Sequence, residues 1–424
     1  MIRARAAFAL GSVQDTAVLD ALLRALDDTD ARVREDAAFA LGQTADSTQR
    51  TVAMRLLHVA ATDGPRALRR SAIEAVGKIG GGDALGPLAS LDVDDDLLPE
   101  LALAIARHGV RGLHSDAALD RITQLLTHPD PATRLLAAYY FGRVPGAEPW
   151  AHVARAVRAA LDAYAPDDPA AMQLLLGLGR LDDVADTGRL THWLAAASDW
   201  RIRVNAARAL AGRVDEAGAA GALVTALADR SPHVAIAAGT SLATAESLPE
   251  AARAAVRSRV DDPAGGWQVP ATLLPVLARE GDVARISEWM GRQSVSAGRA
   301  RALNALALAD APGAAERLLE AARDPDPRLA AAAIAALAQR RARAATAPGT
   351  DAYYDAFSDA LRRPDVAVRV AAVRALADTA FRAAGAARAL AAAYDALRLP
   401  DDLEAIVEVV RALGAVGGTD AEPA

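Results

Sequence analysis

The chain lacks several residue types, and each absence removes a class of structure or chemistry. Its 424 residues include no cysteine, so disulfides, thiolate nucleophiles and cysteine-held metals are excluded. Only 4% of the residues are aromatic, and Lys78 is the single lysine. No apolar run approaches the ~18 residues needed to cross a bilayer, so we expect no membrane span.

Residues that catalyse reactions or hold metals are few and scattered. The nearest grouping of such residues is His108 and His114 with Asp116, which we interpret as structural because no metal-site spacing surrounds it. The glycine-rich segments 80–82 and 177–179 follow no strand, so neither is a phosphate-binding loop. The sequence therefore predicts no catalytic, cofactor-binding or metal-binding residue, and we expect that the chain itself is not an enzyme.

The charge balance also bears on the class of partner. The net charge is −7 and the isoelectric point is near 5.6. A nucleic-acid scaffold usually shows a basic face, so we expect no nucleic-acid partner. Hydrophobic residues nevertheless reach 52%, which is typical of helices rich in alanine and leucine that stack on one another.

One phrase recurs along the whole chain. It reads Asp-x-x-Val-Arg followed by Ala-Ala-x-Ala-Leu-Gly or a close variant, as in segments 30–42, 199–211 and 365–377. A phrase repeated every 30 to 40 residues indicates a stack of similar supersecondary units. Thirteen occurrences align on a closing Gly or Ala, with those at Ala278 and Ala307 fitting poorly: Gly11, Gly42, Gly77, Ala106, Gly142, Gly179, Ala211, Ala243, Ala278, Ala307, Ala338, Ala377 and Gly414.

Each unit is predicted to hold two helices. The first carries an apolar stripe at three- and four-residue steps, as from Val18 to Leu26, and a short turn such as 27–30 follows it. The second helix carries the phrase, and its small alanines let neighbouring helices approach closely. We expect that an aspartate before this helix caps it and that the arginine after the valine bridges two carboxylates in the stack.

These residues resemble the HEAT repeat, in particular the short bacterial form named for phycobilisome lyases. The resemblance covers residues 2–414. It implies an all-α, right-handed α-α superhelix (solenoid) of about thirteen helical hairpins, acting mostly as a scaffold or partner-binding surface. Fold analogy alone does not choose among functions.

The regularity of the phrase predicts how the chain is divided. Residues 1–247 are expected to be regular repeats and 308–414 further repeats, with a flexible tail or linker at 415–424. Between them, residues 248–307 are degenerate, since Pro270 and Pro275 fall within the second helix. That stretch is either a bend between two sub-solenoids or simple repeat decay.

The candidate binding surface is the exposed side of the second helices. Six residues past the opening apolar position, up to Leu176, five of six residues are apolar or aromatic, and beyond it the row turns polar and basic. We expect Phe39 and Tyr139 to lie in solvent; the alternative is that tight curvature buries the row between repeats. The candidate groove residues are Phe39, Leu103, Leu135, Tyr139, Met172, Leu176, Arg208, Arg374 and Arg411.

These features favour a non-enzymatic scaffold that binds a protein or peptide in a concave groove. The alternatives are a regulatory or substrate-gathering arm of a longer enzyme, such as a cyclophilin-type peptidyl-prolyl isomerase, or a bilin lyase-like protein; acidic charge speaks against a DNA glycosylase. No capping substitution covers either end, so we expect a longer natural protein or self-association through the ends. A cytoplasmic location is favoured, with a periplasmic one open if the natural start lies upstream.

Overall fold

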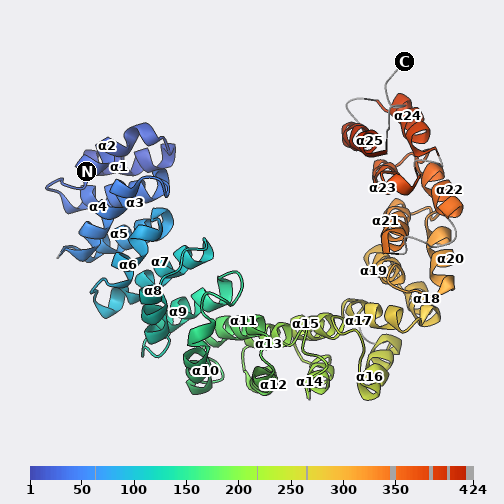
Figure 1. The fold of residues 1–424 in the computed structure, drawn as a ribbon, viewed down its shortest axis with the longest axis horizontal. Coiled ribbons are helices and arrows are strands. Elements are labelled where there is room, and N and C mark those ends of the chain that lie inside the picture. The colour runs from blue at the N-terminus through green and yellow to red at the C-terminus, as the bar shows by residue number, and fades with distance from the viewer. Residues whose placement is uncertain are drawn as a thin grey trace. The chain divides into compact units, whose positions relative to one another are not determined.

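The chain forms an all-α stack of helical hairpins (Figure 1). The computed structural model describes residues 1–62, 64–216, 218–263, 266–343, 350–381, 385–398 and 402–416. Within these residues it contains 25 α-helices and five short 3-10 helices. None of the helices there is long and apolar enough to cross a membrane. The stack confirms the all-α solenoid predicted from the repeated phrase.

The helices alternate between two sets. The second helices, which carry the phrase, are α1 (Ile2–Val13), α3 (Ala31–Thr44), α5 (Arg66–Ile79), α7 (Leu98–Val110), α9 (Pro131–Arg143), α11 (Ala171–Leu181), α13 (Trp200–Ala209), α15 (Pro232–Leu242), α17 (Gln268–Arg279), α19 (Ser296–Leu306), α21 (Pro327–Arg343), α23 (Val366–Leu376) and α25 (Leu403–Val416). The first helices are α2 (Leu19–Ala25), α4 (Arg50–Ala61), α6 (Gly82–Ala89), α8 (Asp116–Leu125), α10 (Ala154–Ala163), α12 (Thr187–Ala196), α14 (Ala219–Ala226), α16 (Glu250–Asp261), α18 (Val283–Gly291), α20 (Pro312–Ala321), α22 (Thr350–Ala360) and α24 (Ala386–Ala396).

The chain divides into two compact units, residues 1–238 and 239–424. In the N-terminal unit each second helix packs on the next, from α1 on α3 through α11 on α13. In the C-terminal unit the same order runs from α17 on α19 to α23 on α25. First helices lie against their own second helix, as α4 does against α5 and α20 against α21. Each unit is therefore a stack in which a hairpin mainly touches its neighbours.

The closing glycine of the phrase is needed for close helix approach. A Cβ on Gly42 would lie 2.7 Å from the Cβ of Ala75, and one on Gly77 would lie 2.7 Å from the Cα of Ala104. Real side chains do not approach so closely, so only glycine lets α3 meet α5, and α5 meet α7, at this distance. The small residues of the phrase thus set the spacing of the stack.

The capping role of the phrase aspartates is confirmed in five units. Asp30, Asp130, Asp199, Asp326 and Asp365 each accept a hydrogen bond from a backbone N–H in the first turn of a second helix. Such a bond satisfies one of the four free amides at a helix start.

Two other aspartates at the same position of the phrase, Asp94 and Asp167, do not cap a second helix in this way. Asp94 makes no such bond, and Asp168 rather than Asp167 accepts from the amide of Ala170.

The predicted role of the phrase arginines is wrong in one respect. Most of them reach the following unit, as Arg134 reaches Asp168 at 2.6 Å, whereas Arg34 donates to carbonyl oxygens of its own turn. They do not bridge two carboxylates, because their remaining N–H groups donate to carbonyls of their own turn: Arg134 binds the carbonyl oxygens of His128 and Pro129, both at 2.8 Å. The carbonyl oxygens at the end of the first helix lack partners within that helix. The N–H groups of the guanidinium therefore donate to them, which leaves no N–H group for a second carboxylate.

Irregular sequence between 248 and 307 still forms helices. Segments α16 to α19 keep the alternation of first and second helices, and Pro275 lies inside α17. The division between the two compact units falls at 238/239, within α15. The three-part division at 247 and 307 remains a prediction. Most of the predicted tail, residues 417–424, lies outside the described residues, as do residues 344–349.

Candidate partner-binding face

The candidate face is formed by one side chain from every second helix, six residues past the opening apolar position. We call these thirteen positions the outer row. None of them is buried: Phe8, Phe39, Glu74, Leu103, Tyr139, Leu176, Arg208, Thr240, Pro275, Asn304, Ala335, Arg374 and Arg411.

Local helix geometry explains the intermediate burial of the apolar members. In α3 the neighbours Ala37, Ala38, Ala40 and Leu41 are all fully buried, and Phe39 lies at the edge of that arc. Leu103, Tyr139 and Leu176 are likewise half-buried, as are Leu135 and Met172 in the same helices.

The placement of Phe39 and Tyr139 in solvent was wrong, because both are half-buried. Phe39 stacks on Phe8 of the adjacent helix with ring centroids 5.4 Å apart and an interplanar angle of 9°. The Lys78 ammonium lies 5.7 Å from the Phe39 ring centre. Tyr139 is covered by the guanidinium of Arg143 at 5.4 Å. The Phe39 ring is therefore contacted by side chains of both adjacent second helices, and the Tyr139 ring by a cation of its own helix.

The basic end of the row is largely neutralised. Arg374 lies 3.1 Å from Glu408 and 3.8 Å from Glu404, and Arg411 also lies 3.1 Å from Glu408. The hydrogen bond from Arg374 lowers the pKa of Glu408, with the charges of both arginines adding to the effect. Arg208, on α13, is exposed.

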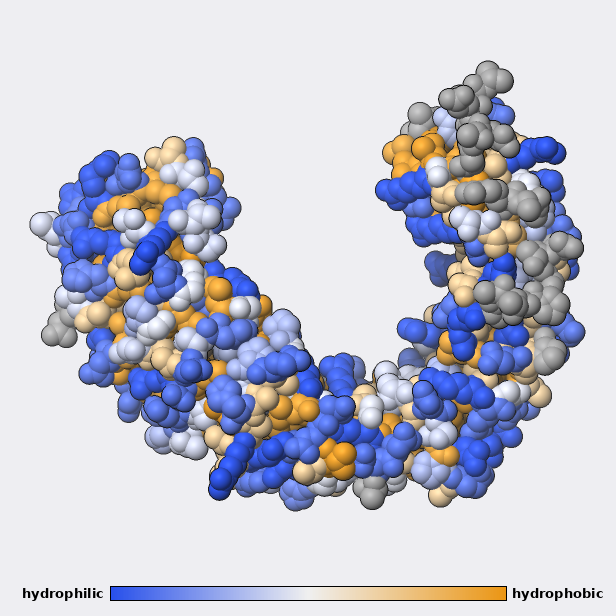
Figure 2. All heavy atoms as spheres, viewed as in Figure 1, coloured by the Kyte–Doolittle hydropathy of each residue, from blue (hydrophilic) through white to orange (hydrophobic). Residues whose placement is uncertain are grey.

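A hollow of about 720 Å³ opens beside this part of the row. It lies between α21, α23 and α25 of the C-terminal unit, with alanines such as Ala331 and Ala335 on one side and the Arg374 and Glu404 side chains on the other. Elsewhere, Figure 2 shows apolar residues interspersed with charged ones across the visible faces of both units.

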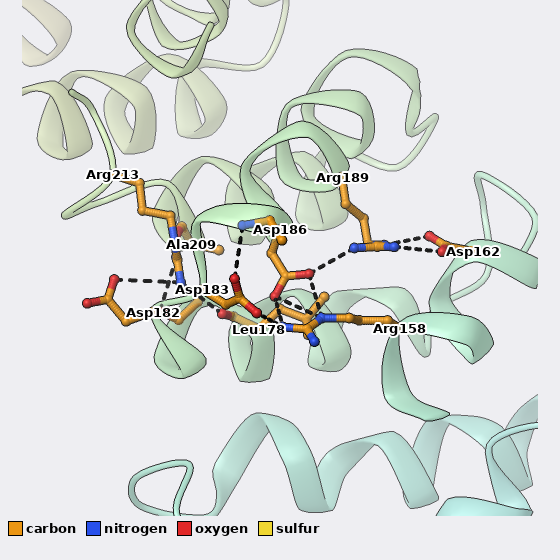
Figure 3. Close-up of polar contacts among 11 residues, drawn as sticks. Arg158, Asp162, Leu178, Asp182, Asp183, Asp186, Arg189, Ala209 and Arg213 are labelled. Atoms are coloured by element: carbon orange, nitrogen blue, oxygen red, sulfur yellow. Dashed lines mark hydrogen bonds and ion pairs between the residues drawn. The ribbon is translucent and has the colours of Figure 1, made fainter. Parts of the chain in front are cut away.

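A charge network around one buried aspartate joins first helices α10 and α12 (Figure 3). Asp186 is fully buried and receives hydrogen bonds from Arg158 at 2.8 Å and from Arg189 at 2.8 Å. Arg158 also reaches Asp183, and Arg189 reaches Asp162. The hydrogen bond to Asp186 raises the pKa of Arg158. Every charge here has a partner of opposite sign, so the cluster holds two hairpins together.

Sequence reasoning missed a set of arginines that cap helix ends. Arg111 donates to carbonyl oxygens at the end of α5, on Gly77, Lys78 and Gly80, at 2.8 to 3.2 Å. We call such residues capping arginines. Four others reach the end of the preceding second helix in the same way: Arg180, Arg213, Arg279 and Arg343. A cation there satisfies free carbonyls and the negative end of the helix dipole.

The sequence contained a signal for part of this set. A basic residue directly follows the closing Gly or Ala of the phrase in five units, and this position holds the capping arginines Arg180 and Arg279; Arg111, Arg213 and Arg343 lie further along the chain. The five residues are Lys78, Arg107, Arg143, Arg180 and Arg279.

The histidine grouping does not form a metal site. His108 is fully buried with its Nδ1 2.9 Å from the carbonyl oxygen of Ala104, and the Nδ1 of His114 is 2.8 Å from the hydroxyl of Tyr140. Across the described part of the chain, no three His, Cys, Asp or Glu side chains are grouped to hold a metal.

The chain is similar to known HEAT-repeat proteins in sequence at its N-terminus and in fold over most of its length. Residues 1–77 match the family model for HEAT repeats. Among solved structures, importin beta aligns with a TM-score of 0.58 at 13% identity, covering 97% of this chain and 64% of that one. The chain therefore folds as a HEAT-type solenoid.

Two further matches are structures of the karyopherin Kap121p, bound to the SUMO protease Ulp1p and to Ste12p. Each has a TM-score of 0.54 at 12% identity and covers 96% of this chain and 53% of the other. The HEAT-type chain thus spans about half the length of the Kap121p structures that it matches. Identities this low show the fold alone. No curated protein sequence matches the chain.

Proposed function

We propose that the chain is a non-enzymatic scaffold that binds a protein partner along the outer row of its second helices. The observation that carries the proposal is the run of Leu103, Leu135, Tyr139, Met172 and Leu176. These large apolar side chains come from three consecutive second helices, and none of them is buried. Partly exposed leucine, methionine and tyrosine in one strip are typical of protein-binding surfaces.

The repeat architecture supports this proposal. Because each hairpin presents the same position to the same side, side chains far apart in sequence form a continuous strip within each compact unit. Tyr139 is well suited to anchor a partner, since Arg143 holds one face of its ring while the rest stays accessible. Two of the similar solved structures are complexes with protein partners, which agrees with the proposal by analogy of fold only.

Finer assignments remain predictions. A bacterial protein of the phycobilisome-lyase type, and a repeat arm of a longer enzyme, are both consistent with a HEAT-type solenoid. No observation on the described residues favours either of them over the scaffold.

Site-specific crosslinking tests the proposal. A photo-crosslinking amino acid replaces Tyr139 in one variant and Asp120, an exposed residue of first helix α8, in a control. We expect one or a few proteins to be captured by the Tyr139 variant in cells and not by the control. Equal capture by both variants, or none by either, would refute the assignment of the binding face.

A further inference from the structure

Three consecutive second helices carry the same pair of residue types one helical turn apart. Leu103 precedes Arg107 by four residues in α7, Tyr139 precedes Arg143 in α9, and Leu176 precedes Arg180 in α11. Residues four apart lie on the same side of a helix. The apolar strip of the outer row is therefore flanked by a parallel row of arginines, within one compact unit.

Two of the guanidinium groups in this region are fixed by the backbone. Arg180 donates to the carbonyl oxygens of Phe141, Gly142 and Val144 at 2.8 to 3.3 Å, and Arg111 is held at the end of α5 in the same way. Arg143 is placed over the Tyr139 ring. Cations held in this way lose little freedom when a ligand binds, which favours affinity.

The positive charge of these arginines is not neutralised within the described residues. No carboxylate there pairs with Arg107, Arg111, Arg143 or Arg180, although the preceding helix pairs Lys78 with Glu74 at 2.9 Å. Burial lowers the pKa of Arg111 and of Arg180, and like charge on Arg107 and on Arg143 lowers them further. A bound carboxylate would oppose both effects, because an opposite charge raises the pKa of a guanidinium.

We propose that α7, α9 and α11 bind an acidic peptide segment whose apolar side chains rest on Leu103, Tyr139 and Leu176 and whose carboxylates meet Arg107, Arg143 and Arg180. This proposal rests on the proposed function and names the chemistry of the partner. Packed helices lie roughly 8–10 Å apart, and a polyproline II chain advances about 9 Å in each three-residue turn. Carboxylates at every third residue of a segment in this conformation lie on one side and would thus match successive arginines.

An acidic peptide fits these residues better than a nucleic acid does. The row beside the arginines is apolar rather than polar, and leucines have no favourable contact with a sugar-phosphate backbone. The chain as a whole carries a net charge of −7, which repels a long polyanion outside this strip.

Binding of synthetic peptides tests the proposal by fluorescence anisotropy with the full chain. The probe is a labelled peptide of about twelve residues that repeats Glu-Leu-Ser. Substituting Arg107→Gln and Arg143→Gln together should weaken its binding about tenfold. The matched control substitutes Arg24→Gln and Arg155→Gln, exposed arginines of first helices α2 and α10, and should change affinity less than about twofold.

Other probes set the limits of the site. A peptide repeating Lys-Leu-Ser, and a peptide of the same composition with its glutamates contiguous, should bind much more weakly. The affinity of the unmodified chain for the Glu-Leu-Ser peptide should also fall as salt rises from about 50 to 200 mM. That readout needs no substitution, so it holds even if a variant folds poorly.

Three results would overturn the proposal. They are no binding of the acidic peptide up to about 1 mM, equal weakening by both double substitutions, and equal competition by oligothymidylate. If the peptide fails while the Tyr139 crosslink still captures a partner, the acidic chemistry is wrong and the scaffold proposal stands.

Discussion

Arg203 donates two hydrogen bonds to Asp229, at 2.8 and 3.0 Å, and so joins the start of α13 to the turn after α14. Both side chains are largely buried, with 6% and 14% of their surface exposed. The same arginine also donates to the carbonyl oxygens of Ala197 and Ser198, both at 2.9 Å. One guanidinium therefore closes its own hairpin and ties it to the next.

The links repeat along both units. Arg3 binds Asp28, Arg134 binds Asp168, Arg299 binds Asp324 and Arg369 binds Asp402. Because each hairpin contacts mainly its neighbours, these links transmit stability along the stack one unit at a time.

Removing the buried arginine should cost much more than removing an exposed one. Arg203→Ala removes two hydrogen bonds and the counter-charge from the largely buried Asp229 carboxylate, and one donor from each of two carbonyls. We expect a loss of roughly 3–5 kcal/mol in the free energy of unfolding. The control is Arg3→Ala, since the Arg3 side chain is 66% exposed and its pair with Asp28 is screened by water. Urea denaturation of both variants measures the difference; equal losses would contradict the role given to burial.

Acid should weaken the same link. Burial alone would raise the pKa of Asp229, but the hydrogen bonds from Arg203 and from the Ser231 amide outweigh it, and the pKa is lowered. Stability from this group is therefore present above the pKa of an unfolded aspartate, about 3.9, and is lost as pH falls through the folded value. Asp229→Asn should flatten the decline of stability below about pH 4. An unchanged acid profile in denaturation experiments would show that the pair contributes nothing.

The closing glycine offers a second test. Gly42→Ala places a Cβ against Ala75 of the next second helix, and we expect a loss of about 1–3 kcal/mol despite the better helix propensity of alanine. Gly221 in α14 has no atom within 4 Å of an added Cβ, so Gly221→Ala should gain about 0.4–1 kcal/mol. Thermal melting of the two variants should shift in opposite directions. A stabilised Gly42→Ala chain would mean that helix spacing adjusts freely.

The repeated phrase predicted the fold because the contacts between adjacent helices require the same residue types in every unit. Gly42, Ala37 and Leu41 must be small or buried for helices to stack, and that demand recurs in every unit. The outer row followed from the same helical period, and its members are indeed not buried.

What the phrase did not predict depends on the turns between helices. Arg34 donates to the carbonyl oxygens of Asp28 and Thr29, and Arg203 to Asp229, an aspartate outside the phrase. The position of the turn decides which oxygen accepts a hydrogen bond from a guanidinium, and that position varies from unit to unit. Neutralisation of Arg374 by Glu408 likewise needs the packing of α23 on α25, which no spacing within one helix reveals.

A buried histidine should make the N-terminal unit sensitive to mild acid. Burial lowers the pKa of His108, a bond to the Ala104 carbonyl opposes this, and the charge of Arg111 lowers it further. The unfolded chain therefore takes up a proton near pH 6.5 before the folded chain does, and stability falls as pH drops below that value. His108→Asn should reduce the difference in urea midpoint between about pH 7 and 5.5. His192→Asn is the control, and an equal change in both variants would contradict the prediction.

Two adjacent tyrosines should behave differently. Tyr139 is half-buried on the outer row, whereas Tyr140 is 1% exposed and packs edge-on against Phe141 with centroids 5.4 Å apart. We expect Tyr140→Ala to cost about 3–5 kcal/mol and to leave little folded protein at moderate temperature. Tyr139→Ala should cost clearly less and should abolish capture of a partner. Similar melting temperatures for the two variants would show that Tyr139 belongs to the core.

The terminal helices expose apolar side chains and predict self-association. On α1, Ile2 is 86% and Val13 is 64% exposed, and on α25 Leu403 and Val410 are 57% and 56% exposed. Uncovered apolar surface of this kind favours contact between copies. Light scattering should therefore show a mass that rises with protein concentration. Ile2→Lys with Val13→Lys should suppress that rise, because the contact would then have to desolvate a charge at each end of α1. As a control, Val184→Lys changes an exposed valine of a 3-10 helix away from both ends and should leave the rise intact. A constant monomer mass at all concentrations would show that the exposed side chains of α1 and α25 do not bring copies together.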